Sequence, residues 1–177
     1  MPPTLLARGL ERFGPVFVQG YGMTESSPLI TMQLHAEHVP EKTGTAGRPM
    51  IGTEVRIVDD HDHDVPLGEP GEVIMRGPQR MKGYWNRPDA NAEVLRGGWL
   101  HTGDLGRLDA DGFVYILDRK KDMVKTGGLN VYSQEVERAL QKHPAIREVG
   151  IIGLPSDRWG EEVTAVVVRR DGAELSE

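Results

Sequence analysis

Residues 118–131 read Asp-Arg-Lys-Lys-Asp-Met-Val-Lys-Thr-Gly-Gly-Leu-Asn-Val, and they divide the chain. The composition changes here into a basic run, Arg119–Lys121, and the segment continues to a pair of glycines at 127–128. Such a segment is typical either of a solvated hairpin or of a cationic loop whose backbone a thin ligand can approach closely. We therefore predict two domains, residues 1–117 and residues 118–177.

The first apolar pattern of the chain is helical. Leu6, Leu10 and Phe13 fall at i, i+4 and i+7, and Gly14 is a suitable stop signal. The apolar run that follows, Val16–Val18, is typical of a strand that is covered on both faces, as in a parallel sheet. This part of the sequence predicts a fragment of α/β sheet.

The middle of the chain predicts antiparallel strands. Val55 and Ile57 alternate with polar neighbours, and Val73 and Met75 do the same. Residues 59–71, rich in turn formers, would connect these two strands as a long hairpin loop. We expect an antiparallel, barrel-like β subdomain flanked by the α/β fragment.

A helix is predicted soon after the basic run. Ser133 is a plausible N-cap, Val136 and Leu140 form an apolar stripe, and Pro144 prevents the helix from continuing. Further strands are predicted at residues 113–117, 149–152 and 163–168. The fold class is therefore α+β.

The composition excludes several functions. The net charge of −6 argues against a nucleic-acid surface, which needs clustered Lys and Arg. The absence of Cys excludes thiol catalysis, disulfides and thiolate metal sites. No apolar run has membrane-spanning length and the N-terminus has no leader pattern, so we expect a cytoplasmic protein without an integral membrane segment.

Residues 19–25, Gln-Gly-Tyr-Gly-Met-Thr-Glu, form the first candidate site. They follow the predicted parallel strand, where open α/β sheets bind ligands. Gly22 would let backbone amides approach a phosphate, Thr24 offers a hydroxyl donor, Glu25 offers an oxygen ligand for Mg²⁺, and Tyr21 could stack on a purine. The alternative is a tight turn with a solvated glutamate.

Residues 98–104, Gly-Trp-Leu-His-Thr-Gly-Asp, form the second. Asp104, held near a glycine, could accept two hydrogen bonds from ribose hydroxyls. The alternative is an Asp that closes its own turn. His101 has no visible partner in the sequence, and we interpret it as a packed or exposed histidine rather than a base.

Residues 59–64, Asp-Asp-His-Asp-His-Asp, are a third candidate, for a metal. His and carboxylate side chains can bind Zn²⁺ or Ni²⁺. Asp also favours turns, and alternating His side chains point the same way only in an extended segment. We favour the turn.

Taken together, the segments resemble those of the adenylate-forming superfamily, which includes acyl-CoA synthetases, luciferases and the adenylation domains of peptide synthetases. The similarity runs through essentially the whole chain. Lys121 and residues 127–137 are most similar to acyl-CoA synthetases of the fatty-acyl and aryl types. The most specific matches are Gly-Tyr-Trp-Asn-Arg-Pro at 83–88, Thr-Gly-Asp at 102–104, Asp-Arg-Lys-Lys-Asp at 118–122 and Gly-Gly-Leu-Asn-Val-Tyr at 127–132.

This resemblance implies a nucleotide site in the first domain. Tyr21 would lie on the adenine, Thr24 would contact the phosphates and Glu25 would hold Mg²⁺. Asp104 would bind the ribose hydroxyls, and Arg119 would reach the same sugar. Residues 1–117 would then be the C-terminal part of a large nucleotide-binding domain.

The resemblance also implies an acyl-transfer loop. Lys121 would be the hinge about which a C-terminal lid rotates between two half-reactions, and Lys125 would belong to the loop that swings in for thioester formation. Gly127 and Gly128 would leave room for the pantetheine arm of CoA. Residues 118–177 would be the hinge and the first part of an incomplete α+β lid.

Several family segments are not found here. The Ser/Thr/Gly-rich phosphate loop and the C-terminal Gly-Lys segment are missing, and Ser133 and Gln134 replace a commoner Pro-containing version. We therefore expect a fragment, inactive by itself, of an AMP-forming ligase that uses ATP, Mg²⁺, a carboxylic acid and CoA. The alternatives are a domain that passes its acyl group to a carrier protein, and a non-catalytic binding fragment. Surfaces exposed by truncation could support an oligomer.

Overall fold

The computed structural model describes residues 3–173. The chain forms two compact units, Met1–Ile116 and Leu117–Glu177. Among the described residues, the first unit contains two β-sheets and the second unit contains one, and each unit has its own buried residues. The interpretation of these units as a nucleotide-binding part and a lid stays a prediction.

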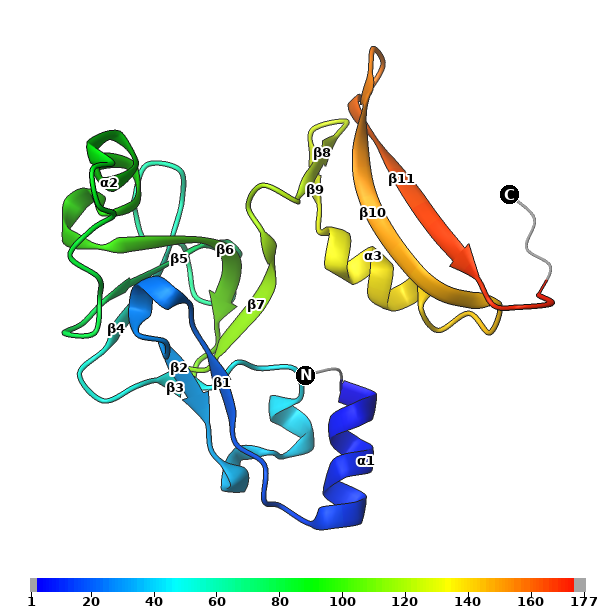
Figure 1. Ribbon diagram of the computed structural model, residues 1–177, viewed down its shortest axis with the longest axis horizontal. Helices are drawn as coiled ribbons and strands as arrows, with labels where there is room; N and C mark the ends of the chain where they lie inside the picture. The colour runs from blue at the N-terminus through cyan, green and yellow to red at the C-terminus, as the bar shows by residue number, and fades with distance from the viewer. Residues whose placement is uncertain (1–2, 174–177) are drawn as a thin grey trace. The chain divides into compact units, whose positions relative to one another are not determined.

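Among its described residues, the first unit contains two α-helices, four 3₁₀ helices and two sheets. Figure 1 labels the α-helices and the strands. The α-helices are α1 (Pro3–Phe13) and α2 (Pro88–Val94), and the 3₁₀ helices are η1 (Thr24–Ser26), η2 (His35–Glu37), η3 (Pro40–Lys42) and η4 (Arg96–Gly98). The strands are β1 (Gln19–Tyr21), β2 (Thr31–Gln33), β3 (Arg48–Pro49), β4 (Glu54–Val58), β5 (Gly71–Arg76), β6 (Leu100–Leu108) and β7 (Val114–Arg119), whose last residues enter the second unit.

The first sheet corrects one prediction. Its order is β1-β2-β3, both pairings are antiparallel, and β1 begins only at Gln19. Val16–Val18 is not a strand: Val16 is 66% exposed and Val18 is 53% exposed. The predicted parallel strand is wrong because, within residues 3–173, no neighbouring strand pairs with this run. Apolar residues alone do not make a strand without such a partner.

The second sheet is an antiparallel meander with the order β4-β5-β6-β7. Residues 59–70 connect β4 to β5, which confirms the long hairpin loop. β5 is the most deeply buried strand, with Val73, Ile74 and Met75 each at most 1% exposed. β4 and β7 are the two edges of this sheet, so the expected barrel-like form is open rather than closed. The α+β class with antiparallel sheets is confirmed.

The core of the first unit joins its two sheets. Ile30, Met75 and Leu100 are completely buried, and Tyr21 and Met23 pack against them. The first candidate loop therefore rests directly on the core, and its position is fixed by packing as well as by hydrogen bonds.

The second unit is a four-stranded antiparallel sheet, β10-β11-β8-β9, with one helix against β10 (Figure 1). Its elements are β8 (Val124–Thr126), β9 (Leu129–Val131), α3 (Ser133–Leu140), β10 (Ile146–Ser156) and β11 (Gly160–Arg169). Gly127 and Gly128 form the two-residue turn between β8 and β9, with φ of 56° and 82°. A tight hairpin with positive φ at both turn positions strongly favours glycine, so the geometry of the hairpin is sufficient to explain why both residues are glycine.

The start of α3 differs from the prediction. Ser133 is the first helical residue, and Tyr132 takes the N-cap position without a side-chain hydrogen bond. The Ser133 hydroxyl instead donates to the Asp118 carboxylate, Oγ to Oδ2, at 2.9 Å, and both residues are buried. The predicted N-cap is wrong because the Ser133 hydroxyl donates its hydrogen bond to this buried carboxylate and does not cap the helix. Asp118, the first residue of the basic segment, is thereby tied to the helix.

Candidate nucleotide site

The turn after β1 presents Thr24 and Glu25. A Cβ atom at Gly22 would overlap the carbonyl oxygen of Pro28, so the turn closes only around glycine. The hydroxyl of the buried Ser26 accepts from the backbone N–H of Met23 at 3.0 Å and donates to its carbonyl oxygen at 2.9 Å. With the inner side of the turn filled, Thr24 is exposed and Glu25 is half-buried.

Two predicted nucleotide residues meet although they lie far apart in the sequence. The Tyr21 hydroxyl donates to the Asp104 carboxylate, Oη to Oδ2, at 2.7 Å. Tyr21 ends β1 and Asp104 lies on β6, so the contact joins the two sheets of the first unit. An aromatic ring and a carboxylate held together can contact a base and a sugar of one nucleotide.

Glu25 has a partner that sequence reasoning missed. The Tyr84 hydroxyl donates to the Glu25 carboxylate, Oη to Oε1, at 2.6 Å. The Asn91 side chain holds Tyr84 by two hydrogen bonds, one from the Tyr84 N–H at 2.7 Å and one to its carbonyl at 2.9 Å. The Glu25 carbonyl also accepts from the Met81 N–H at 2.8 Å. Residues 81–91 therefore support both the backbone and the side chain of Glu25.

The contact with Glu25 raises the pKa of Tyr84, with burial as a smaller cause. Glu25→Gln should lower this pKa towards the ordinary value of 10.0, because the carboxylate that accepts the hydrogen bond of the Tyr84 hydroxyl is replaced by a neutral amide. A phenol pKa raised by folding stabilises the fold fully below the unfolded pKa, and that contribution is lost as pH rises through the folded pKa. The measurement is a ¹³C-tyrosine NMR titration of the 177-residue chain.

Tyr115 provides an internal control for this titration, since burial is the main reason that its pKa is raised and Glu25 does not contribute. Its pKa should therefore not change in Glu25→Gln. A Tyr84 pKa that is the same with and without the carboxylate would contradict the assigned contact.

Asp104 sits on an irregular part of β6. The register pairs Glu72 with Leu105 and Ile74 with His101, so three residues of β6 lie opposite one residue of β5. Such bulges redirect side chains and are frequent beside active sites. Asp104 is the last residue of this bulge.

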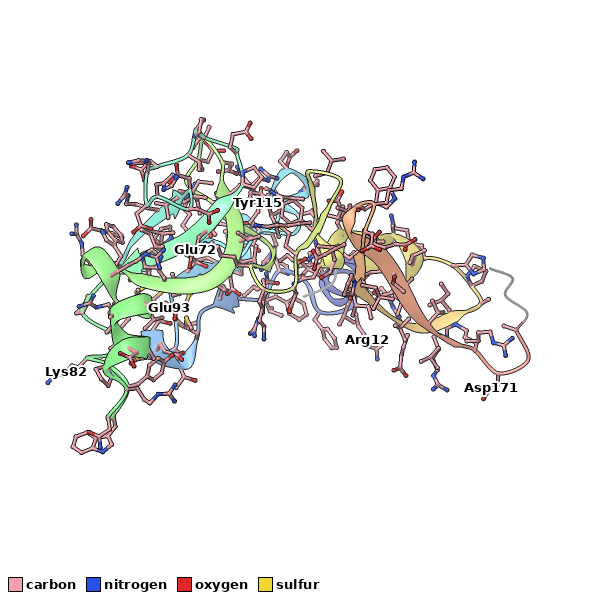
Figure 2. The ribbon with its side chains drawn as sticks, turned by 90° about the horizontal axis from the view of Figure 1, so that it is seen from above. Arg12, Glu72, Lys82, Glu93, Tyr115 and Asp171 are labelled. Atoms are coloured by element: carbon pink, nitrogen blue, oxygen red, sulfur yellow. The ribbon has the colours of Figure 1, made fainter. Side chains whose placement is uncertain are left out.

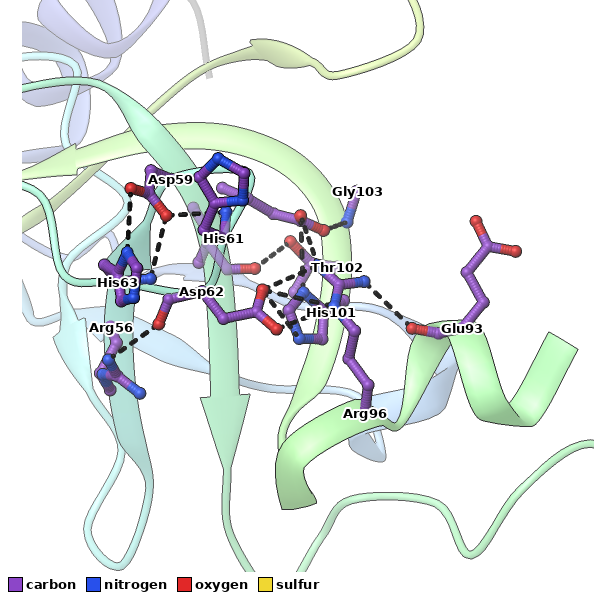
Figure 3. Close-up of polar contacts among 12 residues, drawn as sticks. Arg56, Asp59, His61, Asp62, His63, Glu93, Arg96, His101, Thr102 and Gly103 are labelled. Carbon is purple, nitrogen blue, oxygen red and sulfur yellow. Dashed lines mark hydrogen bonds and ion pairs between the residues drawn. The ribbon is translucent and has the colours of Figure 1, made fainter.

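Next to the bulge residues Thr102 and Gly103, Figure 3 shows Asp62, Arg96 and His101 close together. His101 and Glu72 are each 5% exposed, and His101 Nδ1 lies 3.5 Å from Glu72 Oε2. Arg96 Nη2 lies 3.6 Å from the same oxygen and donates to Asp62 Oδ1 at 2.9 Å. This Asp62 contact is the main reason that the pKa of Arg96 is raised. His101 is thus packed, one of the two arrangements expected for it.

The loop at residues 59–64 is a turn. The Asp59 carboxylate accepts from the backbone N–H groups of His61 at 2.8 Å and His63 at 2.9 Å, and these bonds, the His63 one first, lower the pKa of Asp59. Across the part of the chain that the structure describes, no three His, Asp or Glu side chains are grouped to hold a metal ion. Asp62 is directed to Arg96.

The other predicted site residues lie on or next to the β8–β9 hairpin. Lys121 is exposed in the turn after Arg119, where the Asp122 N–H donates to the Arg119 carbonyl at 3.0 Å. Lys125 is exposed on β8, and its N–H donates to the Glu161 carboxylate at 2.6 Å. A Cβ atom added at Gly128 would have no atom within 4 Å, whereas one added at Gly127 would lie 3.0 Å from the Trp159 ring.

The chain matches two families of known proteins. Residues 1–85 match the AMP-binding enzymes, and residues 135–177 match the C-terminal domain of AMP-binding enzymes. A feruloyl-CoA synthase of Amycolatopsis sp. is 48% identical over 99% of this chain and 35% of its own length. A medium/long-chain-fatty-acid–CoA ligase of Mycobacterium tuberculosis is 46% identical over 99% of this chain and 31% of its own length.

This chain belongs to the AMP-binding enzyme family. The resemblance found in the sequence is thereby confirmed. Among solved structures, o-succinylbenzoate CoA synthetase of Bacillus subtilis with its acyl-adenylate OSB-AMP is 40% identical, with a TM-score of 0.90 over 98% of this chain and 35% of that chain. This AMP-binding chain spans about a third of the length of these relatives.

Sequence reasoning missed two features of this AMP-binding family member. Tyr84 lies in a matched motif but had no predicted role, and Glu72 was not among the candidates. The signal for Glu72 was an acidic residue inside an otherwise apolar strand, Gly71–Arg76, where an unpaired charge is costly. Every helix within residues 3–173 is too short or too polar to span a bilayer.

Proposed function

We propose that this chain is the nucleotide-binding and hinge-bearing portion of an ATP-dependent acid–CoA ligase. The acid would be a fatty or aromatic one, in line with the fatty-acid–CoA ligase and feruloyl-CoA synthase named above. The observation that carries the proposal most directly is the contact between Tyr21 and Asp104, which supports a shared site for adenine and ribose. We also propose a cytoplasmic location.

The proposed reaction has two steps. First, a carboxylate oxygen of the acid attacks the α-phosphorus of ATP, and pyrophosphate leaves with the electrons of the broken P–O bond. Second, the CoA thiol loses its proton to solvent, its sulfur attacks the carbonyl carbon of the acyl-AMP, and AMP leaves with the electrons of the broken C–O bond. The first step replaces the poor leaving group of a carboxylate by a good one.

Residues of the first unit would serve the first step. Asp104 would accept hydrogen bonds from the ribose hydroxyls, Tyr21 would lie against the adenine, and the exposed Thr24 hydroxyl would donate to a phosphate. Glu25 fits a Mg²⁺ ion because its half-buried carboxylate is oriented by Tyr84 and is of the ligand type that Mg²⁺ prefers. Bound there, the ion would neutralise charge on the leaving pyrophosphate.

Residues of the second unit would serve the second step. We propose Lys121 as the hinge, Arg119 as a further ribose contact, and Lys125 with Gly127 and Gly128 as the loop beside the CoA arm. The exposed Lys125 and the open space around Gly128 support this assignment. Transfer to a carrier protein instead of CoA is the competing proposal, and a comparison of the two acceptors in a thioester assay distinguishes them.

Glu25→Gln tests the nucleotide assignment in the full ligase. The variant keeps the shape of the side chain but loses a negative ligand, so acyl-AMP formation should fall roughly 100-fold, the loss typical of an electrostatic group at the reacting phosphate. The measurement is single-turnover formation of acyl-AMP with varied Mg²⁺. Glu54→Gln, which removes an exposed carboxylate paired with Arg76, is the matched control and should be close to wild type. Equal rates for Glu25→Gln and wild type would reject the assignment.

A further inference from the structure

The bulge that carries Asp104 is closed by side chains. The Thr102 hydroxyl donates to the Val73 carbonyl at 2.7 Å and accepts from the Asp104 N–H at 3.1 Å. Gly103 has a φ of 72°, and its N–H donates to Glu72 Oε1 at 3.2 Å. The direction in which Asp104 leaves the strand is therefore set by Thr102 and Glu72.

Burying a charged carboxylate costs free energy, so we expect the charge of Glu72 to have a role that a neutral side chain could not fill. It lies on β5, the most buried strand of the sheet (Figure 2), and its side chain is 6% exposed. A neutral group could accept one N–H, but a carboxylate makes a stronger hydrogen bond. The Arg96 guanidinium, whose Nη2 lies 3.6 Å from the other carboxylate oxygen, offsets this charge, and the His101 ring packs 3.5 Å from the same oxygen.

Asp104, the residue after Gly103, carries the proposed ribose contact. Asp104 Oδ2 accepts from the Tyr21 hydroxyl, which fixes one oxygen from the opposite sheet. Glu72 acts one residue earlier in the chain, on the backbone of Gly103. The Asp104 carboxylate is thus oriented from its side chain by Tyr21 and from its backbone by Glu72.

We propose that Glu72 is a positioning residue for Asp104. Its buried carboxylate, whose charge is offset by Arg96, accepts a hydrogen bond from the Gly103 N–H so that Asp104 presents its carboxylate to the 2′- and 3′-hydroxyls of the nucleotide ribose. The inference rests on the proposed function for the ribose contact. The hydrogen bond from the Gly103 N–H to Glu72 lies within the chain and does not depend on the proposed function.

The first arm of the test measures the hydrogen bond between the Gly103 N–H and Glu72 in the 177-residue chain. In Glu72→Gln the Gly103 amide proton should move upfield and exchange with solvent about tenfold faster, because a charge-assisted hydrogen bond becomes a neutral one. Glu72→Asp keeps the charge but shortens the side chain, so the same change at Gly103 is expected even if Glu72→Gln folds poorly. Glu54→Gln is the control and should leave the Gly103 amide unchanged. An unchanged Gly103 amide in both Glu72 variants overturns the inference.

The second arm measures ribose recognition by amide NMR titration of the chain with AMP, 2′-deoxy-AMP and 3′-deoxy-AMP. Wild type should bind AMP most tightly. Glu72→Gln should weaken AMP roughly tenfold while it changes the deoxy analogues much less, because the lost contacts are those to the missing hydroxyls. A general loss of structure would weaken all three alike, and that result overturns the inference. A wild-type chain that binds AMP and its deoxy analogues equally contradicts the ribose role of Asp104 and thus the proposed function.

Discussion

Gly22→Ala should destabilise the first unit by roughly 3 kcal/mol, at the upper end of the cost of overpacking. The added methyl group would overlap the Pro28 carbonyl oxygen, and a backbone atom cannot move aside as a flexible side chain can. The turn must therefore open, and with it the contacts of Tyr21 and Met23 with the core. A loss of this size is a large part of the stability of an ordinary domain.

Urea unfolding measures this loss if one unit is followed at a time. In a Trp159→Phe background the remaining tryptophans, Trp85 and Trp99, both lie in the first unit. Gly44→Ala is the matched control in the same unit, because no atom lies within 4 Å of the added methyl group and only the backbone strain at a φ of 83° is added, roughly 1–2 kcal/mol. Equal midpoints for Gly22→Ala and Gly44→Ala would show that the turn is not closed around Gly22.

Gly128→Leu in the full ligase should slow acyl transfer to CoA about 100-fold, a loss that a small misplacement of reacting groups can produce. Acyl-AMP formation should stay within about threefold of wild type, because the proposed nucleotide contacts other than Arg119 lie in the first unit. Any side chain at a φ of 82° is strained by roughly 1–2 kcal/mol, so Gly128→Ala is the control. It carries the same backbone strain with little bulk, and the difference between Ala and Leu reports the space for pantetheine.

Lys121→Pro tests the hinge in the same two half-reactions. Proline fixes φ and restricts the residue before it, so the turn after Arg119 would lose the freedom that a rotation needs. If the locked orientation is the adenylating one, acyl-AMP forms and transfer to CoA fails. Single-turnover rates of the two steps decide the matter. Equal losses in both steps for Lys121→Pro and Gly128→Leu would leave the segment as an ordinary solvated hairpin.

Local patterns in the sequence predicted those parts of the fold that depend on neighbours in the chain. The alternation around Val55 and Val73 and the helical spacing from Leu6 were confirmed because period and turn signals are local. Val16–Val18 was misassigned since a strand needs a partner, and an apolar run does not say whether one is present. The first residue of α3 was misassigned because the Ser133 hydroxyl donates its hydrogen bond to a carboxylate distant in the sequence, that of Asp118.

The candidate site shows the same division. Tyr21 and Asp104 could be selected from their motifs, but the hydrogen bond between them depends on how two sheets pack. Tyr84 and Glu72 act on residues 59 and 31 positions away in the chain, and no spacing rule relates such partners. The sequence therefore predicted the candidate binding residues, whereas the contacts that orient their side chains could be found only in the structure.

The meander β4-β5-β6-β7 has a consequence for the order in which the chain folds. Each strand pairs with the next one along the chain, so each pairing closes only the loop between them, residues 59–70, 77–99 or 109–113. The entropy lost on closing a loop grows with its length, and local pairings form faster than distant ones. The contact of Gly47 with Val114, which ties the first sheet to this meander, closes a much longer loop. The strands of the first sheet also pair in chain order, so each of the two sheets should form before they dock, and Tyr21 should reach Asp104 only late in folding.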